Sequence, residues 1–374
     1  MQTTLPPASS RLPRVAIDAR LMYYRRAGIA QYTRHLTRAL ARAGAAYTGA
    51  KLVVLLDRRD RDNAWVPPGV DIVRTVTPAH HRFEHLLLPI ELLRYQLQFD
   101  VLHSPDFIAQ HGRYKKVITI HDLYFLEHPE VMQAAARRYY GRIAWSAGIA
   151  DAIIAVSDFT RREIARLLPD VPASKVTVIA EAAANQLPVS ALETPVENLQ
   201  YALFVGTFEP RKNLVTLLRA MKELPPDVRL MVVGESGWGA TTPARVAQEL
   251  GLKDRVTFAG RVSDAELDQY YRGARLLVMP SLSEGFGLPV LEAMTRGVPV
   301  VCSNAGSLLE IAGDAALMHD PLDAAALARL IGVVWGSGAV RMDYGRRGMQ
   351  RAECFSWAGA AQATWRVYQA AQKP

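Results

Sequence analysis

Cysteine is scarce in this chain, with only Cys302 and Cys354 among 374 residues. Two thiols cannot build a disulfide framework or a four-ligand zinc site, which excludes the small stapled domains. We expect both thiols to be buried and reduced. Long apolar runs are missing as well, because charges or prolines interrupt each one well short of the ~20 residues that a membrane helix needs. The polar start lacks the apolar core of a signal peptide, so we expect a cytoplasmic protein, soluble or peripheral to a membrane.

Several signatures of enzyme sites are also absent. The sequence has no Walker A motif, no G-x-S-x-G elbow and no repeat of 20–50 residues. His80, His81 and His85 lack carboxylates at metal-ligand spacing. Asp60 and Asp62 form a D-x-D pattern inside a charged run, which we interpret as a solvated loop. We therefore expect no metal.

What the chain does have is the composition of a large globular protein, with 50% apolar and 21% charged residues. At about 100–200 residues per domain, this length suggests two domains. Residues 1–180 contain 25 basic and 16 acidic side chains, whereas residues 181–374 contain 19 and 20. A basic first half favours an anionic partner such as a phosphate or an acidic lipid surface, although a solvated basic surface is the alternative. Nucleic acid is not expected, because no basic helix or aromatic platform stands out.

Short β-branched runs alternate with helical patterns along most of the chain. Such alternation predicts parallel sheets covered by helices on both faces. A polar break at residues 182–200 divides the pattern, so the fold class is α/β with two doubly wound domains, at 1–185 and from 186 onward. The predicted strands are Val15–Asp18, Leu52–Leu56, Asp71–Arg74, Val101–His103, Val117–His121, Ile153–Val156, Ala202–Val205, Leu230–Val233, Val256–Phe258, Leu276–Met279 and Val298–Cys302.

The loops that follow the strands are the candidate sites, because open α/β sheets bind ligands beyond the carboxyl ends of their strands. The strongest signal is a loop in which Gly285 and Gly287 let the backbone turn and approach a ligand. Pro289 is expected at the first position of the next helix, whose amides would form an anion site. Glu284 and Glu292 would accept hydrogen bonds from sugar hydroxyls. The alternative is a capping loop with a surface glutamate.

A second loop opens at Gly206, directly after a predicted strand. Arg211 and Lys212 are adjacent cations in it and would meet a diphosphate at the same sheet edge, unless they are solvated charges. Asn213 is predicted to cap the following helix rather than to bind a ligand.

Three further loops carry weaker signals. The glycine-rich stretch Gly234–Gly239 lacks the spacing of a dinucleotide fingerprint. Gly28 follows the first predicted strand. His121 ends the strand Val117–His121 and would point toward the ligand edge, although a lone histidine is often only structural.

The stretch from Gly206 to about Pro321 resembles the retaining glycosyltransferases of family four, whose fold is GT-B. The motif Glu-x₇-Glu, here Glu284 and Glu292, carries this resemblance together with the Gly-Thr-x-Glu-x-Arg-Lys-Asn loop. The first half is similar more thinly, through the segments Ile17–Arg20, Gly28, His121–Leu123 and Val156–Asp158.

The resemblance implies two Rossmann-like domains that face a central cleft. It implies an acceptor-side domain at residues 1–185, a donor domain at 186–355 and a last helix at 356–374 that crosses back to the first domain. It also implies residue roles. Glu292 would bind the ribose, Glu284 would lie beside the donor sugar, Arg211 and Lys212 would neutralise the departing diphosphate, and His121 would touch the sugar. The donor-binding set is completed by Gly206, Gly285, Phe286, Gly287, Leu288 and Gly28.

The function implied is metal-independent transfer of a hexose from a nucleotide diphosphate to an acceptor hydroxyl with retention, as in polysaccharide biosynthesis. No cofactor is expected beside the nucleotide-sugar substrate. Similarity to mannosyltransferases of the family favours GDP-mannose over UDP-glucose or another UDP-hexose. The acceptor is expected to be a glycan or a lipid-linked oligosaccharide. The stripe at 85–98 is interpreted as core, with peripheral docking to a membrane through the basic first domain as the alternative.

Two readings from other classes compete with transfer. A nucleotide-sugar epimerase would convert the sugar without an acceptor, but the Glu-x₇-Glu pattern opposes it. A subunit that binds sugar nucleotides without turnover would not need Glu284, Glu292, Arg211 and Lys212 together.

Overall fold

A computed structural model describes residues 13–24, 28–45, 50–95, 99–131, 134–184, 201–237 and 242–372. The chain forms two compact units, each built on a parallel sheet. The first contains the described residues up to 129, residues 134–181 and those from 356 onward; the second contains the described part of 182–355 with Glu130 and Val131. The predicted boundary between residues 185 and 186 lies outside the described residues.

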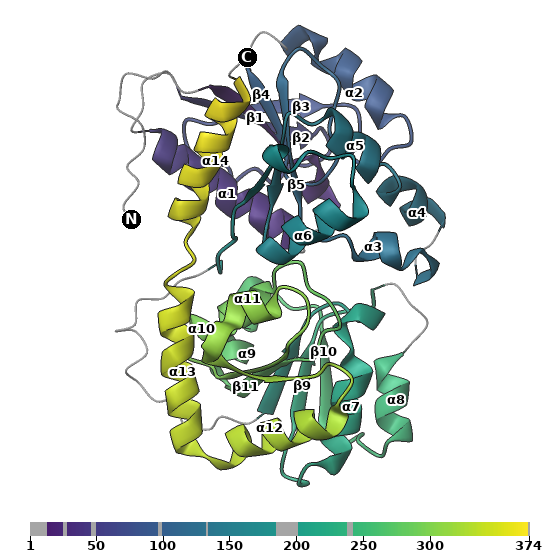
Figure 1. Cartoon of the computed structure of the whole chain (residues 1–374), viewed down its shortest axis with the longest axis vertical. Helices are drawn as coiled ribbons and strands as arrows, with labels where there is room; N and C mark the ends of the chain where they lie inside the picture. Colours follow the sequence, from purple (N-terminus) through teal and green to yellow (C-terminus); the bar gives the residue numbers. More distant parts are fainter. Residues whose placement is uncertain are drawn as a thin grey trace. The chain divides into compact units, whose positions relative to one another are not determined.

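The sheet of the first unit has seven parallel strands in the order β3-β2-β1-β4-β5-β6-β7 (Figure 1). The strand order reverses between β1 and β4, which is the place where ligands bind in such sheets. All six strands predicted here are confirmed, but the short edge strand β7 was not predicted. The strands are β1 Arg14–Asp18, β2 Lys51–Asp57, β3 Asp71–Thr75, β4 Val101–Ser104, β5 Lys115–Ile120, β6 Ala152–Ala155 and β7 Val176–Val178.

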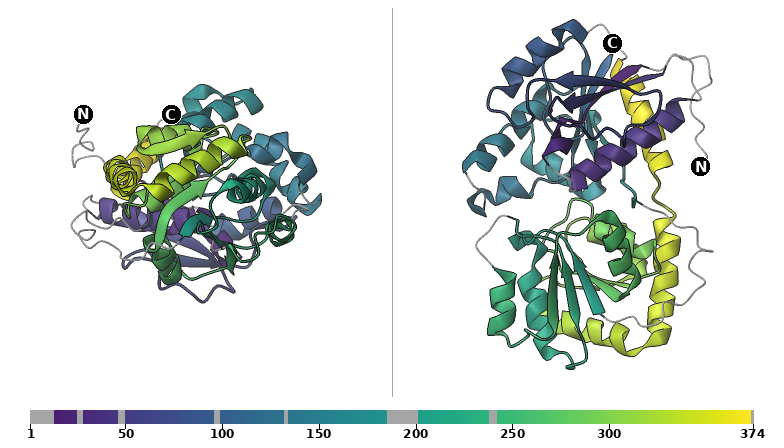
Figure 2. Two further views of the ribbon diagram at one scale, coloured as in Figure 1. Left: turned by 90° about the horizontal axis from the view of Figure 1, so that it is seen from below. Right: turned by 180° about the vertical axis from the view of Figure 1, so that it is seen from behind.

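Side chains that alternate along β1 pack against helices on opposite faces of this sheet. Val15 and Ile17 contact α1 (Gly28–Gly44) and α14 (Trp357–Gln372), which lie side by side in Figures 1 and 2. Ala16 packs in the opposite layer with α2 (Glu84–Leu92). The other α-helices of this unit are α3 Tyr124–Glu127, α4 Ala134–Tyr140, α5 Ile143–Ile149 and α6 Asp158–Leu167.

The sheet of the second unit has six parallel strands in the order β10-β9-β8-β11-β12-β13. Its strand order reverses between β8 and β11, so these two strands flank its ligand edge. The five predicted strands are confirmed, and the edge strand β13 was missed. The strands are β8 Tyr201–Val205, β9 Leu230–Val233, β10 Val256–Gly260, β11 Ala274–Met279, β12 Val300–Ser303 and β13 Ala316–His319.

Leucine-rich faces of α7 (Leu214–Glu223) and α12 (Ala324–Gly336) cover this sheet and build its core with side chains of β8, β9 and β11. The other α-helices of the unit are α8 Pro243–Glu249, α9 Asp264–Arg272, α10 Leu288–Met294, α11 Leu308–Ala312 and α13 Gly338–Ala352. The loop that carries Glu284 runs from the end of β11 to the start of α10.

Three details differ from the sequence-based expectations. Cys302 is buried in β12, where burial raises the pKa of its thiol to about 12, but Cys354 is exposed after α13. Pro289 occupies the second rather than the first position of α10. Of the stripe at 85–98, Leu88 and Leu92 are buried whereas its other described leucine and isoleucine residues are exposed, and Gln98 lies outside the described residues.

Within the described part of the chain, no single helix is long and apolar enough to cross a membrane. The helical segments 324–336 and 338–372 satisfy the length and composition criteria only when they are taken together, and the chain bends by 102° between them.

Candidate active site

The loops that follow β8 and β11 lie at the ligand edge of the second unit. A short 3-10 helix, Pro210–Lys212, lies in the first loop, and the second loop runs from Pro280 to the start of α10. The backbone amide of Leu282 donates a 2.7 Å hydrogen bond to the carbonyl of Arg211, which fastens the two loops together. Topology therefore brings together two predicted site segments that are about seventy residues apart.

Glu284 stands at the centre of a buried charge cluster. The Lys212 ammonium donates to Glu284 Oε1 at 2.7 Å and to Oε2 at 2.8 Å. Arg211 Nη1 lies 3.4 Å from Glu284 Oε2, and its Nε donates to Glu209 Oε2 at 2.8 Å. The cluster holds two cations and two carboxylates, so its charges balance in the unliganded protein.

Burial alone would raise the pKa of the Glu284 carboxyl. The charges of Lys212 and Arg211 and the hydrogen bonds from Lys212 and Ser281 outweigh burial and hold that pKa below its ordinary value. Glu284 is therefore ionised at neutral pH. Its oxygens contact cations and the Ser281 hydroxyl, whereas the sequence suggested sugar hydroxyls as partners.

Three hydroxyl and amide side chains fix the loop that carries Glu284. Ser281 Oγ donates to Glu284 Oε1 at 2.7 Å, and Ser307 Oγ donates to the Phe286 carbonyl at 2.8 Å. Asn213 lies at the predicted cap position of α7, but its side-chain oxygen does not cap that helix. Its Nδ2 instead donates to the carbonyls of Pro280 and Pro321 at 2.9 and 2.7 Å. Asn213 thus ties the loops after β8, β11 and β13 together.

The glycine-rich turn requires a glycine at position 287 for steric reasons. Gly287 has φ +99°, and a Cβ there would lie 2.7 Å from a methyl group of Leu308. Phe286 is buried and packs edge-on against Phe355, and Leu288 begins α10. Gly206, at the end of β8, bonds through its amide to the Val233 carbonyl.

Glu292 lies one turn into α10 and has a different environment from Glu284. Its Oε2 accepts a 2.7 Å hydrogen bond from the Tyr271 hydroxyl, and Arg296 bonds to its backbone carbonyl at 2.7 Å. Burial raises the pKa of the Glu292 carboxyl despite that hydrogen bond. No described residue donates a hydrogen bond to Glu292 Oε1, so that oxygen can accept one from a ligand hydroxyl.

His121 lies in the first unit, one residue beyond β5. Its Nδ1 is 2.8 Å from Glu181 Oε1, and its Nε2 is 2.8 Å from the Pro105 carbonyl oxygen. Burial would lower the pKa of this imidazole, but the hydrogen bond and charge of Glu181 outweigh burial and raise that pKa. Gly28 is the first residue of α1, and open space surrounds the position of its missing Cβ.

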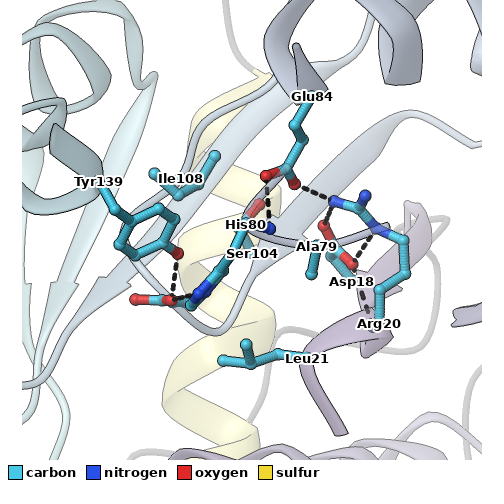
Figure 3. Close-up of a pocket in the computed structure, with 10 residues that line it drawn as sticks. Asp18, Arg20, Leu21, Ala79, His80, Glu84, Ser104, Ile108 and Tyr139 are labelled. Carbon is cyan, nitrogen blue, oxygen red and sulfur yellow. Dashed lines mark hydrogen bonds and ion pairs between the residues drawn. The ribbon is translucent and has the colours of Figure 1, made fainter. Parts of the chain in front are cut away.

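A small polar cavity of about 20 Å³ lies at the carboxyl ends of β1 and β4 in the first unit (Figure 3). The fully buried Arg20 lies between two carboxylates there, 2.6 Å from Asp18 Oδ2 and 2.5 Å from Glu84 Oε1. On the other side the Tyr139 hydroxyl donates to Asp106 Oδ2 at 2.7 Å. A cavity of this volume holds one water but not a sugar. We therefore interpret the ion pairs that line it as structural.

The predicted site residues therefore fall into two groups. Those of the second unit come together around the β8 and β11 loops, whereas His121 and Gly28 belong to the first unit. Sequence reasoning missed Glu181, Ser281 and the bridging role of Asn213. Glu181 carried no signal, because it is sixty residues from His121 in the chain. Asp60 and Asp62 lie in the loop after β2, and no group of three possible metal ligands occurs among the described residues.

Comparisons with known proteins agree for both halves of the chain. Residues 26–182 match the family described as Glycosyltransferase Family 4, and residues 191–351 match the family described as Glycosyl transferases group 1. The chain is 37% identical over 281 residues to O-antigen chain mannosyltransferase B of Escherichia coli, covering 72% of this chain and 74% of that protein.

Two further likenesses extend over most of the chain. D-inositol 3-phosphate glycosyltransferase of Kineococcus radiotolerans is 30% identical over 329 residues, which cover 76% of this chain and 74% of that protein. The structure of sucrose-phosphate synthase from Thermosynechococcus elongatus superposes with a TM-score of 0.75 at 22% identity, over 96% of this chain and 98% of that one. The second likeness concerns the fold.

Proposed function

From the premise that this chain is a hexosyltransferase belonging to the glycosyltransferases with family 4 and group 1 domains, we propose that it transfers mannose from GDP-mannose to a glycan with retention of configuration. The observation that carries the proposal is the Lys212–Arg211–Glu284 cluster at the strand-order reversal of the second unit. The mannose assignment rests on the relative named as an O-antigen chain mannosyltransferase.

The departing diphosphate is the main chemical problem of such a transfer. Negative charge develops on its oxygen while the anomeric carbon becomes cationic, so cations placed in advance give the largest stabilisation. The Lys212 ammonium has three donors, and its partners are the two oxygens of Glu284. At least one N–H can therefore meet a phosphate oxygen while Glu284 keeps the ammonium in place.

Glu292 fits the ribose. Its helix begins directly after the glycine turn, and its Oε1 is open to a hydroxyl group while Tyr271 holds Oε2. A carboxylate can accept hydrogen bonds from neighbouring hydroxyls of one sugar. We therefore assign Glu292 to the nucleotide ribose and the cluster around Glu284 to the diphosphate and the donor sugar.

Transfer without a divalent metal is part of this proposal, because N–H groups of Lys212 and Arg211 can donate to the diphosphate oxygens that a metal would otherwise bind. Turnover in excess EDTA should stay within about twofold of the untreated enzyme. Loss of turnover that Mg²⁺ or Mn²⁺ restores would contradict the assignment.

The substrate test is a donor panel. The protein is incubated with GDP-mannose, UDP-glucose or UDP-galactose and a mannose-terminated lipid-linked acceptor, and nucleotide release and the anomeric configuration of the product are measured. We expect GDP release and an α-linked product. Turnover of UDP-hexoses alone would overturn the donor, an inverted product would overturn retention, and conversion of the sugar without an acceptor would indicate an epimerase.

We further propose that the first unit docks on the cytoplasmic face of a membrane with anionic lipids, where a lipid-linked acceptor would be found. Helix α2 is apolar on two sides: Leu88 and Leu92 are buried, whereas Leu86 and Ile90 are 55% and 64% exposed. Leu93, the first residue after α2, is 62% exposed. An exposed apolar face of this kind is typical of an interaction surface.

The charges beside this face suit an anionic bilayer. The Arg82 guanidinium lies over the Phe83 ring, and that of Arg94 over the Tyr95 ring. Glu91 on the same helix accepts hydrogen bonds from the backbone amides of Val76 and Thr77, and its carboxylate lies 4.0 Å from the Arg94 guanidinium.

Vesicle sedimentation tests the docking proposal. Binding to phosphatidylglycerol vesicles should exceed binding to phosphatidylcholine vesicles and should fall about tenfold or more in Ile90→Glu, since a buried carboxylate opposes insertion. Leu322→Glu, at a 77% exposed position of the second unit, is the control. Equal sedimentation of both variants would contradict docking through α2.

A further inference from the structure

Both ring nitrogens of His121 face oxygen acceptors. Nδ1 lies 2.8 Å from a carboxylate oxygen of Glu181, and Nε2 lies 2.8 Å from the carbonyl oxygen of Pro105. A carbonyl oxygen accepts only, so Nε2 must carry a proton. An ionised Glu181 also requires a proton on Nδ1, and an imidazole with both protons is a cation.

We propose that Glu181 is a positioning residue that holds His121 as an imidazolium, so that its Nε2–H is the donor offered to an oxygen of the sugar nucleotide. This inference rests on the proposed function and on the family resemblance, which implies that His121 touches the donor sugar. No covalent bond changes in this step: an oxygen of the substrate replaces the Pro105 carbonyl as acceptor, and His121 keeps both protons.

The geometry makes Glu181 specific for this role. Its side chain is 3% exposed, and its recorded hydrogen-bond partner among the described residues is His121. A buried carboxylate needs a compensating charge, and of the residues that the structure describes, only His121 can supply one at hydrogen-bond distance. The Tyr32 ring also packs edge-on against the His121 ring, with 4.9 Å between the two ring centroids.

The other groups around His121 agree with a cationic ring. Asp106, in the loop after β4, adds negative charge and raises the His121 pKa further. His103 on β4 is neutral, since burial and the charge of His121 lower the pKa of His103 to about 3. Burial raises the pKa of Tyr32 on α1, so its hydroxyl is neutral too. Two carboxylates, those of Glu181 and Asp106, therefore favour the charged form of His121.

Turnover as a function of pH distinguishes positioning from a purely structural role. In the wild type, turnover should fall as pH rises through the raised pKa of His121, because the imidazolium is the active form. Glu181→Gln keeps a hydrogen-bond acceptor but removes the charge, so this fall should begin at a lower pH. We also expect kcat to fall about tenfold or more with little change in KM for the donor, as for loss of a hydrogen bond to a charged group.

Three further variants complete the experiment. Glu181→Asp keeps the charge and should keep the pH of the fall closer to wild type. Glu163→Gln, a surface carboxylate paired with Arg166 in the same unit, is the matched control and should change neither kcat nor the profile. In a His121→Ala background, Glu181→Gln should have no further effect on kcat.

Each result has a distinct meaning. If His121→Ala keeps wild-type kcat, the sugar contact that the resemblance implies for His121 fails. If His121→Ala loses activity while Glu181→Gln keeps the wild-type kcat and pH profile, only the positioning role of Glu181 is overturned. Additive losses in the double variant also overturn it, since they would show that Glu181 acts independently of His121.

Discussion

Lys212 is held in a fixed position by a carboxylate and still has a hydrogen-bond donor left for a ligand. Its ammonium is bound to both oxygens of the buried Glu284, and Glu284 is in turn held by Ser281. The carboxylate fixes the position of the charge, and the remaining N–H group stays available. In the proposed function, a diphosphate would meet a cation that needs no rearrangement, which is the condition for strong electrostatic catalysis.

Replacing Lys212 by Ala should lower kcat by about 10²–10³, which corresponds to ~3–4 kcal/mol of transition-state stabilisation. Arg211→Ala should have an effect in the same range. Lys222→Ala, at an exposed position near the end of the following helix α7, is the control and should be neutral. Steady-state kinetics with the donor at saturation measure the effect, and near-wild-type kcat for both site variants would refute the leaving-group role.

Glu284 also makes stability depend on pH. Its pKa is lowered in the folded protein, because the charges of Lys212 and Arg211 outweigh burial. The folded state therefore gains stability from this ionised group above the ordinary pKa of a glutamate, and loses that contribution as pH falls through the lowered pKa. Melting temperatures between pH 6 and pH 3 should fall less steeply for Glu284→Gln than for wild type. Parallel curves would show that Glu284 does not contribute.

At the scale of elements, the two loops of the site owe their shape to interactions that sequence patterns reveal only in part. Strand ends and the glycine turn were predictable, because apolar runs, glycines and a proline mark them locally. The bonds from Asn213 to Pro280 and Pro321, and from His121 to Glu181, join distant parts of the chain, and nothing in the local sequence announces them.

The missed strands have a similar explanation. β7 (Val176–Val178) and β13 (Ala316–His319) are edge strands of three and four residues. Both are only partly buried, so neither shows the continuous apolar run of an inner strand. The apolar stripe at 85–98 was predicted to be core, but only part of it is buried. The amino-acid type alone does not tell whether an apolar residue faces the sheet or the solvent.

Gly306 tests the fit between the loops after β11 and β12. It has φ +62°, and a Cβ there would lie 2.6 Å from the Glu284 nitrogen and 2.8 Å from its carbonyl oxygen. Gly306→Ala should lower the free energy of unfolding by about 1–3 kcal/mol and should also reduce kcat, because Glu284 would be displaced. Chemical denaturation and kinetics measure both effects. Gly336→Ala, with open space around its Cβ, is the control; equal stability of the two variants would contradict the packing argument.

At the scale of the whole molecule, the end of the chain completes the first unit. Helix α14 packs against α1, and the fully buried Trp365 donates from Nε1 to the Leu40 carbonyl at 3.2 Å. Tyr368 bonds to His103 Nδ1 at 2.6 Å, and His103 Nε2 to Thr119 Oγ1 at 2.8 Å. The C-terminal helix is therefore part of the core of the unit that contains His121.

Trp365→Ala should lower the free energy of unfolding by about 3–5 kcal/mol, as expected for a large aromatic side chain lost from a core. The control is Trp145→Ala on α5, where the side chain is 39% exposed and the cost should be much smaller. Denaturant titration followed by circular dichroism gives both values. A loss for Trp365→Ala as small as the one expected for Trp145→Ala would mean that α14 contributes little to the first unit.

The central claim is that the β8 and β11 loops of the second unit bind the diphosphate of a guanosine nucleotide. Calorimetric titration of the wild type and Lys212→Ala with GDP and UDP tests it most directly. We predict that the wild type binds GDP at least about tenfold more tightly than UDP, a difference of ~1.4 kcal/mol, and that Lys212→Ala weakens GDP binding. Tighter binding of UDP, or GDP binding unaffected by Lys212→Ala, would contradict the claim.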